Sequence, residues 1–377
     1  MQRESSPPRI NWQDIVASQG LTFHTPRGRK YWDESVRYRF RAEEIDVIEK
    51  ATNDLQELCL IAAGHIIDNQ RWRDLRIPES AVTAIEKAWE SDPPSIYGRF
   101  DLAYDGKNPP KLLEYNADTP TTLVEADVIQ WYWLQDVRGR GADQFNSLHE
   151  KLVAQWKQIR PCLKKGPLYL TAARATEDEM TLAYMDEVAR QAEIPTKAMA
   201  IRDIGWNARA GEFRDLEEAK LNNVFALYPW EWLLNEYPDA ILQSQRDTFW
   251  IEPIWKMLWS NKALLAILWE LFPGHPNLLE ARLDGPGNMK EYVRKPILSR
   301  EGANILLKTE HGKFATSGTY ADEACVWQTN AAIPQFDGFY PVIGSWIVTD
   351  HGACGMGIRE SDTPITNNLS RFVPHYF

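Results

Sequence analysis

The hydrophobic period changes along the chain, and this change limits the folds that the chain can adopt. Between Glu43 and Asp68, apolar residues recur every three or four positions, which is the spacing of a helix that packs on one face. From Tyr292 onward, short apolar or β-branched runs alternate with turn residues, as they do in sheets. These runs are Tyr292–Lys295, Asn304–Lys308, Val342–Thr349 and Ala353–Ile358. The pattern disfavours a helical bundle and a β-sandwich, and we expect an α+β or mixed α/β fold.

The middle of the chain adds a strand, helix, strand unit. Leu168–Thr171 and Thr196–Ile201 have the pattern of short strands, and Glu177–Gln191 between them has that of a helix. A further helix is expected from about Glu125 to Asp136, where apolar residues surround the axis and indicate burial.

Composition excludes several classes of protein. The 377 residues carry 42 Lys and Arg against 53 Asp and Glu, a formal charge of -11, which disfavours a nucleic-acid partner. No run of about 18 apolar residues occurs, and the first residues lack the apolar core of a signal peptide, so we expect a cytoplasmic protein without a membrane partner. The four cysteines lie far apart, which indicates free thiols. We expect one unit over residues 1–377, with approximate sub-lobes at 1–160, 161–260 and 261–377.

A predicted hairpin carries a cluster of polar side chains. Arg99–Leu102 and Leu113–Asn116 alternate as strands do, and Asp105–Pro110 between them has turn chemistry. If Asp101 pairs with Glu114, then Arg99 pairs with Asn116, and the four polar groups share one face. Opposed carboxylates repel, so a divalent cation on Asp101, Glu114 and the Asn116 oxygen would compensate. A solvated surface hairpin explains the same spacing.

Basic residues elsewhere could bind an anion. Lys295 ends a predicted strand, and Arg300 lies in the loop Ser299–Asn304, whose small residues allow backbone amides to approach a phosphate. Lys262 follows Asn261, which is expected to begin a helix with Lys262 in its first turn. Each segment alone also fits an ordinary turn or cap.

Taken together, several motifs resemble the synthetase part of glutathionylspermidine synthase, and most closely the short bacterial members that lack an amidase domain. The motifs occur in one order over nearly the whole chain. They are Arg99-Phe100-Asp101, Glu114-Tyr115-Asn116-Ala117-Asp118-Thr119, Glu252-Pro253-Ile254-Trp255, Asn261-Lys262-Ala263, Lys295-Pro296-Ile297 with Arg300, and Gly357-Ile358-Arg359. The resemblance implies an ATP-grasp-type fold, with mixed and antiparallel sheets flanked by helices, and carbon-nitrogen ligation with ATP and Mg²⁺ as cofactors.

The resemblance also implies roles for individual residues. Asp101, Glu114 and Asn116 resemble the family's magnesium ligands, and Lys262, Lys295 and Gln328 resemble its nucleotide contacts. Arg300 resembles an arginine on a mobile loop, while Arg99 and Arg359 face developing negative charge. On the substrate side, the resemblance implicates Thr119, Glu177 and Asp178. The chain departs from the family pattern at Tyr228-Pro229-Trp230-Glu231-Trp232.

The implied reaction joins a small-molecule or peptide carboxylate to an amine through an acyl phosphate. Two alternatives stay open from the residues alone. A glycoside hydrolase could use Asp101 and Glu114 as paired carboxylates and some of the 16 tryptophans for sugar stacking. A nucleotide-binding regulatory protein could keep the ATP site without catalysis. The sequence leaves the acid, the amine and the oligomeric state open.

Overall fold

A computed structural model describes residues 1–173 and 175–377. The helices are α1 (Trp12–Ser18), α2 (Ala42–Asp68), α3 (Glu79–Ser91), α4 (Gln130–Val137), α5 (Leu148–Ile159), α6 (Thr176–Gln191), α7 (Trp230–Glu236), α8 (Pro238–Ser244) and α9 (Leu264–Leu271). In the part of the chain that the structure describes, no helix combines the length and the apolar character needed to cross a bilayer.

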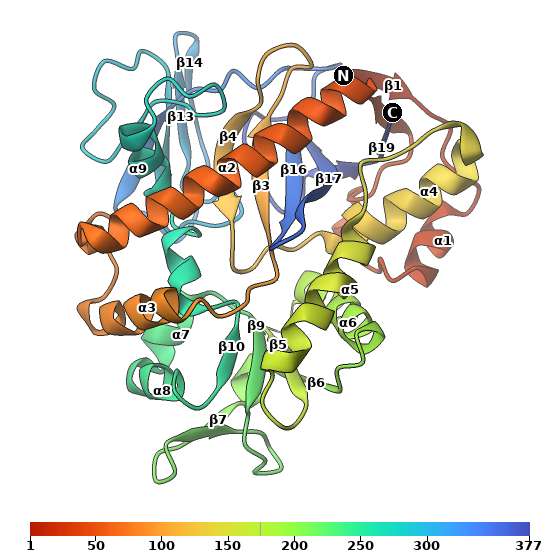
Figure 1. Ribbon diagram of the computed structural model, residues 1–377. Helices are drawn as coiled ribbons and strands as arrows, with labels where there is room; N and C mark the ends of the chain where they lie inside the picture. Colours follow the sequence, from red (N-terminus) through yellow and green to blue (C-terminus); the bar gives the residue numbers. More distant parts are fainter. Residues whose placement is uncertain (174) are drawn as a thin grey trace.

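The central sheet takes its strands from both halves of the chain. Its order is β18 (Arg371–Val373), β17 (Gly352–Ser361), β16 (Tyr340–Val348), β3 (Tyr97–Ala103) and β4 (Lys111–Asn116), and neighbouring strands are antiparallel. The long helix α2 packs on β16 and β17 and crosses the sheet diagonally (Figure 1). The proposed sub-lobe division stays a prediction, although this sheet joins its first range to its third.

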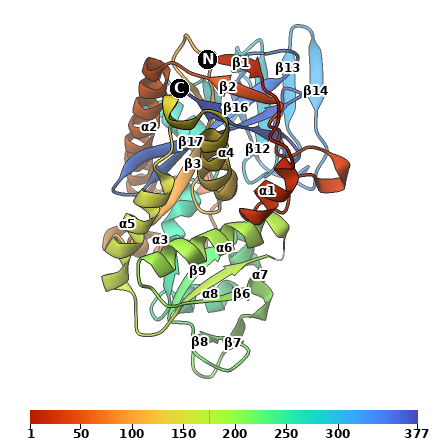
Figure 2. The ribbon, with the colours of Figure 1, turned by 90° about the vertical axis from the view of Figure 1, so that its right-hand side faces the viewer.

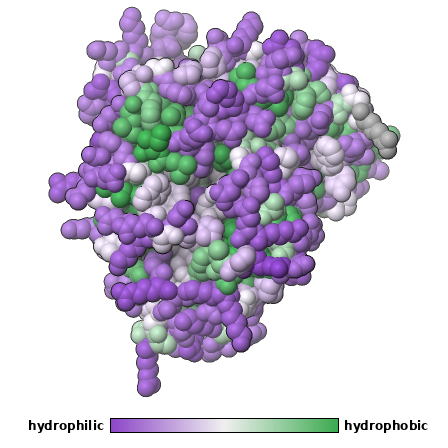
Figure 3. All heavy atoms as spheres, in the orientation of Figure 1, coloured by the Kyte–Doolittle hydropathy of each residue, from purple (hydrophilic) through white to green (hydrophobic). Residues whose placement is uncertain are grey.

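The packing of α2 follows from its sequence. Ile45, Ile48, Leu55 and Ile66 lie on the buried side of the helix, as the period predicts, and the Glu44 carboxylate accepts the backbone N–H of Arg41 at 2.8 Å to cap its first turn. Figure 3 shows this side of the molecule as hydrophilic with apolar patches, and Leu60 and Ile61 of α2 are exposed. Burial of one face therefore holds the helix against the sheet.

A second antiparallel sheet lies beside the first, at the end of the molecule where α9 lies (Figure 1). Its order is β11 (Ala281–Arg282), β15 (Cys325–Thr329), β12 (Tyr292–Pro296), β13 (Leu306–Thr309) and β14 (Gly312–Ala315). The strand at Tyr292 and those from Val342 and Ala353 onward confirm the predicted sheet-rich C-terminal third.

The third large sheet is parallel and lies at the opposite end of the molecule, next to α6, α7 and α8 (Figure 2). Its order is β10 (Phe249–Ile251), β9 (Asn223–Leu227), β5 (Leu168–Ala172) and β6 (Thr196–Ala200). The β5, α6, β6 unit confirms the predicted strand, helix, strand segment. Two small sheets complete the fold, one of β1 (Gln2–Ser5), β2 (Val36–Arg39) and β19 (His375–Tyr376), the other of β7 (Gly205–Asn207) and β8 (Glu212–Arg214).

The helix expected from about Glu125 to Asp136 forms in two parts. Val124–Ile129 is a π-helical turn, and α4 continues from Gln130. Glu125 and Asp127 are buried in this turn, where their hydroxyl partners are Tyr31 and Tyr184. The apolar period could not predict this π-helical turn, because the turn buries two carboxylates, whereas the period marks only apolar residues as buried.

Candidate active site

Strands β3 and β4 form the predicted hairpin, and its register is the one that was supposed for Asp101 and Glu114. Asp101 lies opposite Glu114, and Arg99 lies opposite Asn116. The register shifts directly after Asp101, because Leu102 pairs with Leu112, and Leu113 is left without a partner. This bulge lies immediately beside the carboxylate pair, a place where bulges commonly redirect side chains.

Asp101 lies between two arginines. Its carboxylate accepts the Nε of Arg99 at 2.8 Å and the Nη2 of Arg359 at 2.6 Å. Only 3% of Asp101 and 5% of Arg99 is exposed, so these charges attract strongly. Arg99 passes over Gly344 on the neighbouring strand β16, where a Cβ would lie 2.8 Å from its Cδ. The absence of a side chain at Gly344 therefore makes room for Arg99.

Glu114 is neutralised by lysines. The Nζ of Lys262 lies 3.0 Å from its carboxylate, and the same ammonium donates to the carbonyl of Ser299 at 2.5 Å. Burial raises the pKa of Glu114, but the ammonium groups of Lys262 and Lys295 lower it by more, so the net shift is downward. Asn116 donates its amide to Glu114 at 3.4 Å.

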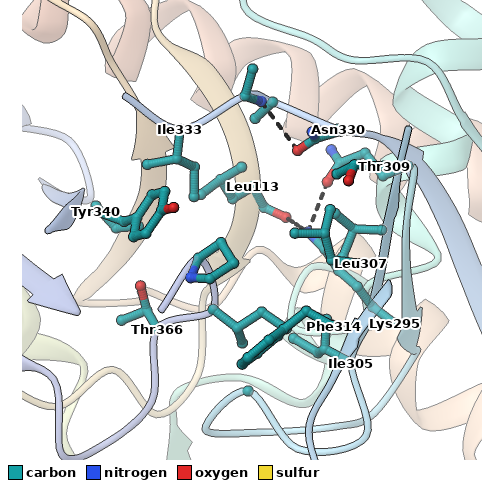
Figure 4. A pocket seen from close by; sticks show the side chains of 18 of the residues that line it. Leu113, Lys295, Ile305, Leu307, Thr309, Phe314, Asn330, Ile333, Tyr340 and Thr366 are labelled. Atoms are coloured by element: carbon teal, nitrogen blue, oxygen red, sulfur yellow. Dashed lines mark hydrogen bonds between the residues drawn. The ribbon is translucent and has the colours of Figure 1, made fainter. Parts of the chain in front are cut away.

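A cavity of about 490 Å³ opens on one side of this pair. Its walls are mostly apolar and come from β4, β12, β13, β14 and the segment after β15 (Figure 4). The labelled side chains place Tyr340 and Thr366 on one side and Leu307 and Lys295 on the other. The volume and the mixture of apolar walls with a few polar groups suit a small organic ligand such as a nucleoside.

Lys295 and Gln328 are two polar residues in the wall of this cavity. The Nζ of Lys295 donates to the carbonyl of Leu113 and to Oε1 of Gln328, both at 2.7 Å. Gln328 in turn donates to the carbonyl of Leu112 at 2.9 Å. Burial lowers the pKa of Lys295 to about 8. The bulged strand β4 thus holds both side chains in place.

A second, polar cavity of about 220 Å³ lies on the other side of the hairpin. Asp101 and Glu114 line both cavities, as do Gly302 and Thr366. The polar cavity also contains Arg99, Asn116, Thr119, Glu177, Asp178, Lys262, Arg300 and Arg359. The carboxylate pair therefore stands at the junction of an apolar and a charged chamber.

Arg300 reaches into the polar cavity from the loop after β12. Its Nη1 donates to the hydroxyl of Thr119 at 2.8 Å, and its Nη2 donates to Glu231 at 3.0 Å. The nearest oxygen of Asp118 lies 3.9 Å away. This arrangement brings the Ser299–Asn304 loop against the segment that follows β4.

Two acids at the start of α6 line the same cavity. Burial and the neighbouring carboxylates of Glu125 and Glu301 raise the pKa of Glu177 to about 7. Burial and Glu301 raise the pKa of Asp178 to about 6. Several negative groups thus converge on one part of the cavity, which favours a cationic ligand there.

The structure places every predicted site residue on the wall of one of the two cavities, whereas their roles stay predictions. One local expectation is wrong. Lys262 precedes α9 rather than lying in its first turn, because Asn261 caps Ala263 through its side chain. Thr122 accepts a hydrogen bond from Arg99 at 3.3 Å.

Sequence reasoning gave no role to Glu231 or Ser260. Ser260 donates to Asp118 at 2.6 Å, and Glu231 accepts Arg300. These contacts join segments 142 and 69 residues apart, so no local period could reveal them. For Glu231, the one signal in the sequence was that Tyr228–Trp232 departs from the family pattern.

The whole chain matches one protein family. Residues 3–377 match the family model described as glutathionylspermidine synthase preATP-grasp. The chain belongs to the glutathionylspermidine synthase family. A putative acid–amine ligase of Haemophilus influenzae is 42% identical over 364 residues, which cover 93% of this chain and 92% of that protein.

Longer relatives match as well. Trypanothione synthetase of Crithidia fasciculata is 27% identical over 84% of this chain and 53% of its own length. The bifunctional glutathionylspermidine synthetase/amidase of Escherichia coli is 27% identical over 82% of this chain and 54% of its own length. The chain spans about half the length of these two proteins.

A solved structure confirms the expected fold. The glutathione synthetase-like effector of Globodera pallida, in its apo form, superposes with a TM-score of 0.56 at 11% identity and covers 99% of this chain and 100% of its own. The ATP-grasp-type α+β architecture is therefore confirmed. The family model and the sequence relatives confirm the predicted family. They also confirm the predicted enzyme class, an ATP-dependent ligase.

The hairpin residues fit a magnesium ion. In residues 1–173 and 175–377, no group of three or more His, Cys, Asp or Glu is arranged to hold a metal alone. Mg²⁺ in nucleotide sites usually takes one or two carboxylates and completes its shell with phosphate oxygens and water. Asp101, Glu114 and the amide oxygen of Asn116 supply such a partial set. By contrast, a glycoside hydrolase needs one carboxyl group that holds a proton as general acid, whereas Asp101 is paired with Arg99 and Arg359, and Glu114 with Lys262.

Proposed function

We propose that the chain is an ATP-dependent ligase that joins a carboxylate to an amine through an acyl phosphate. One observation carries the proposal, namely that Asp101 and Glu114 line both the apolar and the polar cavity. A nucleoside in the first cavity would direct its phosphates past these carboxylates toward the cations of the second. Phosphoryl transfer depends mainly on such positioning and on cancellation of charge.

The residues divide between the two chambers. Lys295 and Gln328 would bind the nucleotide, while Lys262 would contact its phosphates. Asp101, Glu114 and Asn116 would hold Mg²⁺, which would supply positive charge to offset that of the phosphates. The substrate carboxylate would attack the γ-phosphorus, the bond from this phosphorus to the β-phosphate oxygen would break, and ADP would leave. Arg99, Arg300 and Arg359 would stabilise the negative charge that develops in this step.

The second step uses the acidic side of the polar cavity. Glu177 and Asp178 would attract an amine through its positive charge, and Thr119 would contact the acid. The bound ammonium would first give a proton to the carboxylate of Glu177 or Asp178. The neutral amine nitrogen would then attack the acyl carbon, the bond from that carbon to the phosphate oxygen would break, inorganic phosphate would leave, and the nitrogen would lose its second proton to the phosphate or to water. Closure of the Ser299–Asn304 loop would keep water from the acyl phosphate.

Release of ADP tests the activity. The protein is incubated with Mg²⁺, ATP and paired panels of short peptide acids and amines, with glutathione and spermidine included because the relatives' names contain them. For any active pair, an acid labelled with ¹⁸O in its carboxylate should transfer one labelled oxygen to inorganic phosphate. Turnover without transfer would contradict the acyl phosphate. Nucleotide binding without turnover for any pair would favour the regulatory protein.

A further inference from the structure

The first turn of α7 contains a tryptophan, a glutamate and a second tryptophan to which the proposed reaction assigns no role. Trp230 is 3% exposed, and its indole N–H donates to the backbone carbonyl of Glu252 at 3.2 Å. This contact anchors the turn to the segment that follows β10. The two residues after Trp230 are thereby held at the edge of the polar cavity, which Trp232 lines.

Glu231 and Trp232 both contact Arg300. The Glu231 carboxylate accepts Nη2 of Arg300 at 3.0 Å, and the Trp232 ring centre lies 5.9 Å from the guanidinium carbon. Thr119 accepts Nη1 at 2.8 Å. Both ends of the planar guanidinium are therefore fixed, and a charged hydrogen bond fixes one of them.

The third nitrogen of the Arg300 guanidinium group, Nε, has no such contact. It is buried and lacks a hydrogen-bond partner within the described residues, and the same is true of Oδ2 of Asp118. A buried donor without a partner is unfavourable. Arg300 lines the polar cavity, so an anion there that reached Nε would supply the missing acceptor and would not need the two nitrogens that Glu231 and Thr119 hold.

We propose that Glu231 is a positioning residue, which holds Arg300 by a terminal nitrogen and leaves Nε–H for negative charge in the polar cavity. The contact also ties the Ser299–Asn304 loop to α7. The catalytic part of this inference rests on the proposed function, because that function assigns Arg300 to the reacting phosphate. The placement of Arg300 can be tested without any substrate.

Trypsin cleavage after Arg300 reports whether its side chain is held, because trypsin must bind a free arginine. The full chain without ligand is compared with Glu231→Gln, which removes the charge, and Glu231→Asp, which keeps it on a shorter side chain. Cleavage after Arg209, an exposed residue between β7 and β8, is the internal reference for general loosening. Glu270→Gln is the matched control, since Glu270 pairs with Arg71 on the surface at 2.9 Å.

Relative to cleavage after Arg209, we expect Glu231→Gln to accelerate cleavage after Arg300 about fivefold, because a neutral acceptor binds guanidinium more weakly than a carboxylate does. Glu231→Asp should lie between Glu231→Gln and the wild type, and Glu270→Gln should match the wild type. Equal rates after Arg300 in Glu231→Gln and the wild type would overturn the inference, whatever the activity of the protein.

Kinetics test the catalytic part. With an active acid and amine pair, Glu231→Gln should lower kcat about tenfold and leave KM for ATP within about twofold, because Lys295 and Gln328 are untouched. Glu231→Asp should recover part of kcat. An unchanged kcat in Glu231→Gln would overturn the catalytic role. Accelerated cleavage in a protein that turns over no pair would overturn the proposed function and this role, while the placement of Arg300 would stand.

Discussion

Asp101 and Glu114 lie directly opposite each other on antiparallel strands, although both carry negative charge. Like charges in this position normally destabilise a hairpin. Here Arg99 and Arg359 contact one carboxylate, and Lys262 contacts the other. The pair is therefore kept in place by cations that would also face the phosphates of a nucleotide.

Replacement of Asp101 by Asn should abolish turnover. Asn keeps the shape but not the charge, so the variant would lose the negative charge that Arg99, Arg359 and the metal ion would share. We expect ADP release to fall roughly 100-fold or more, with an unchanged far-UV circular dichroism spectrum. Asp54→Asn on the outer side of α2 is the control. Full ADP release in Asp101→Asn would show that this carboxylate has no part in the reaction.

Lys295→Met should weaken nucleotide binding. The variant keeps much of the side-chain volume but loses the ammonium group that contacts Leu113 and Gln328. A non-hydrolysable ATP analogue with Mg²⁺ should raise the melting temperature of the wild type, because the analogue binds only the folded state. The shift should be at least halved in Lys295→Met at the same analogue concentration. A shift equal to that of the wild type would remove Lys295 from the nucleotide site.

The pKa of Glu177 predicts a pH-dependent loss of stability. Burial and neighbouring carboxylates raise this pKa to about 7, from 4.5 in the unfolded chain. Between these pH values the folded state retains a proton that the unfolded state has released, so stability falls as pH rises toward 7. Glu177→Gln removes this effect and should be more stable than the wild type at pH 8 by on the order of 1 to 3 kcal/mol.

Urea unfolding at pH 4 and pH 8 measures this difference. At pH 4 the Glu177 carboxyl group is mostly protonated in the folded and in the unfolded state, so the variant should match the wild type. Glu187→Gln, on the exposed side of α6, controls for loss of negative charge from the helix. A Glu177→Gln variant that gained no stability at pH 8 would show that the carboxylate is not destabilised by its surroundings.

A buried ion pair should fix the start of β3. The Nζ of Lys256 lies 2.6 Å from Glu252 and donates to the carbonyl of Tyr97 at 2.8 Å. Glu252 also accepts the backbone N–H groups of Ile96 and Tyr97. Lys256→Met leaves this carboxylate buried without its counter-ion, which should cost about 3 to 5 kcal/mol of unfolding free energy. Lys50→Met, which breaks an exposed pair with Asp54, should cost less than about 0.5 kcal/mol. Similar losses in the two variants would contradict the role of the buried pair.

The sequence predicts those parts of the molecule that local chemistry determines. The hairpin followed from strand alternation and from turn residues nearby in sequence, whereas the register of Asp101 with Glu114 was only supposed there and is established by the structure. The helix 42–68 followed in the same way from its apolar period. Contacts such as Glu231 with Arg300, or Ser260 with Asp118, depend on how distant segments pack, and no period encodes them. The π-helical turn at Val124–Ile129 was missed because its buried acids interrupt the apolar pattern.

The central claim is that the Asp101 and Glu114 pair holds MgATP between the two cavities. A crystal structure with Mg²⁺ and a non-hydrolysable ATP analogue tests it most directly. We predict the adenine among Leu307, Ile305 and Lys295, and a metal ion about 2.1 Å from oxygens of Asp101 and Glu114. A nucleotide bound elsewhere, or a metal without contact to either carboxylate, would contradict the account.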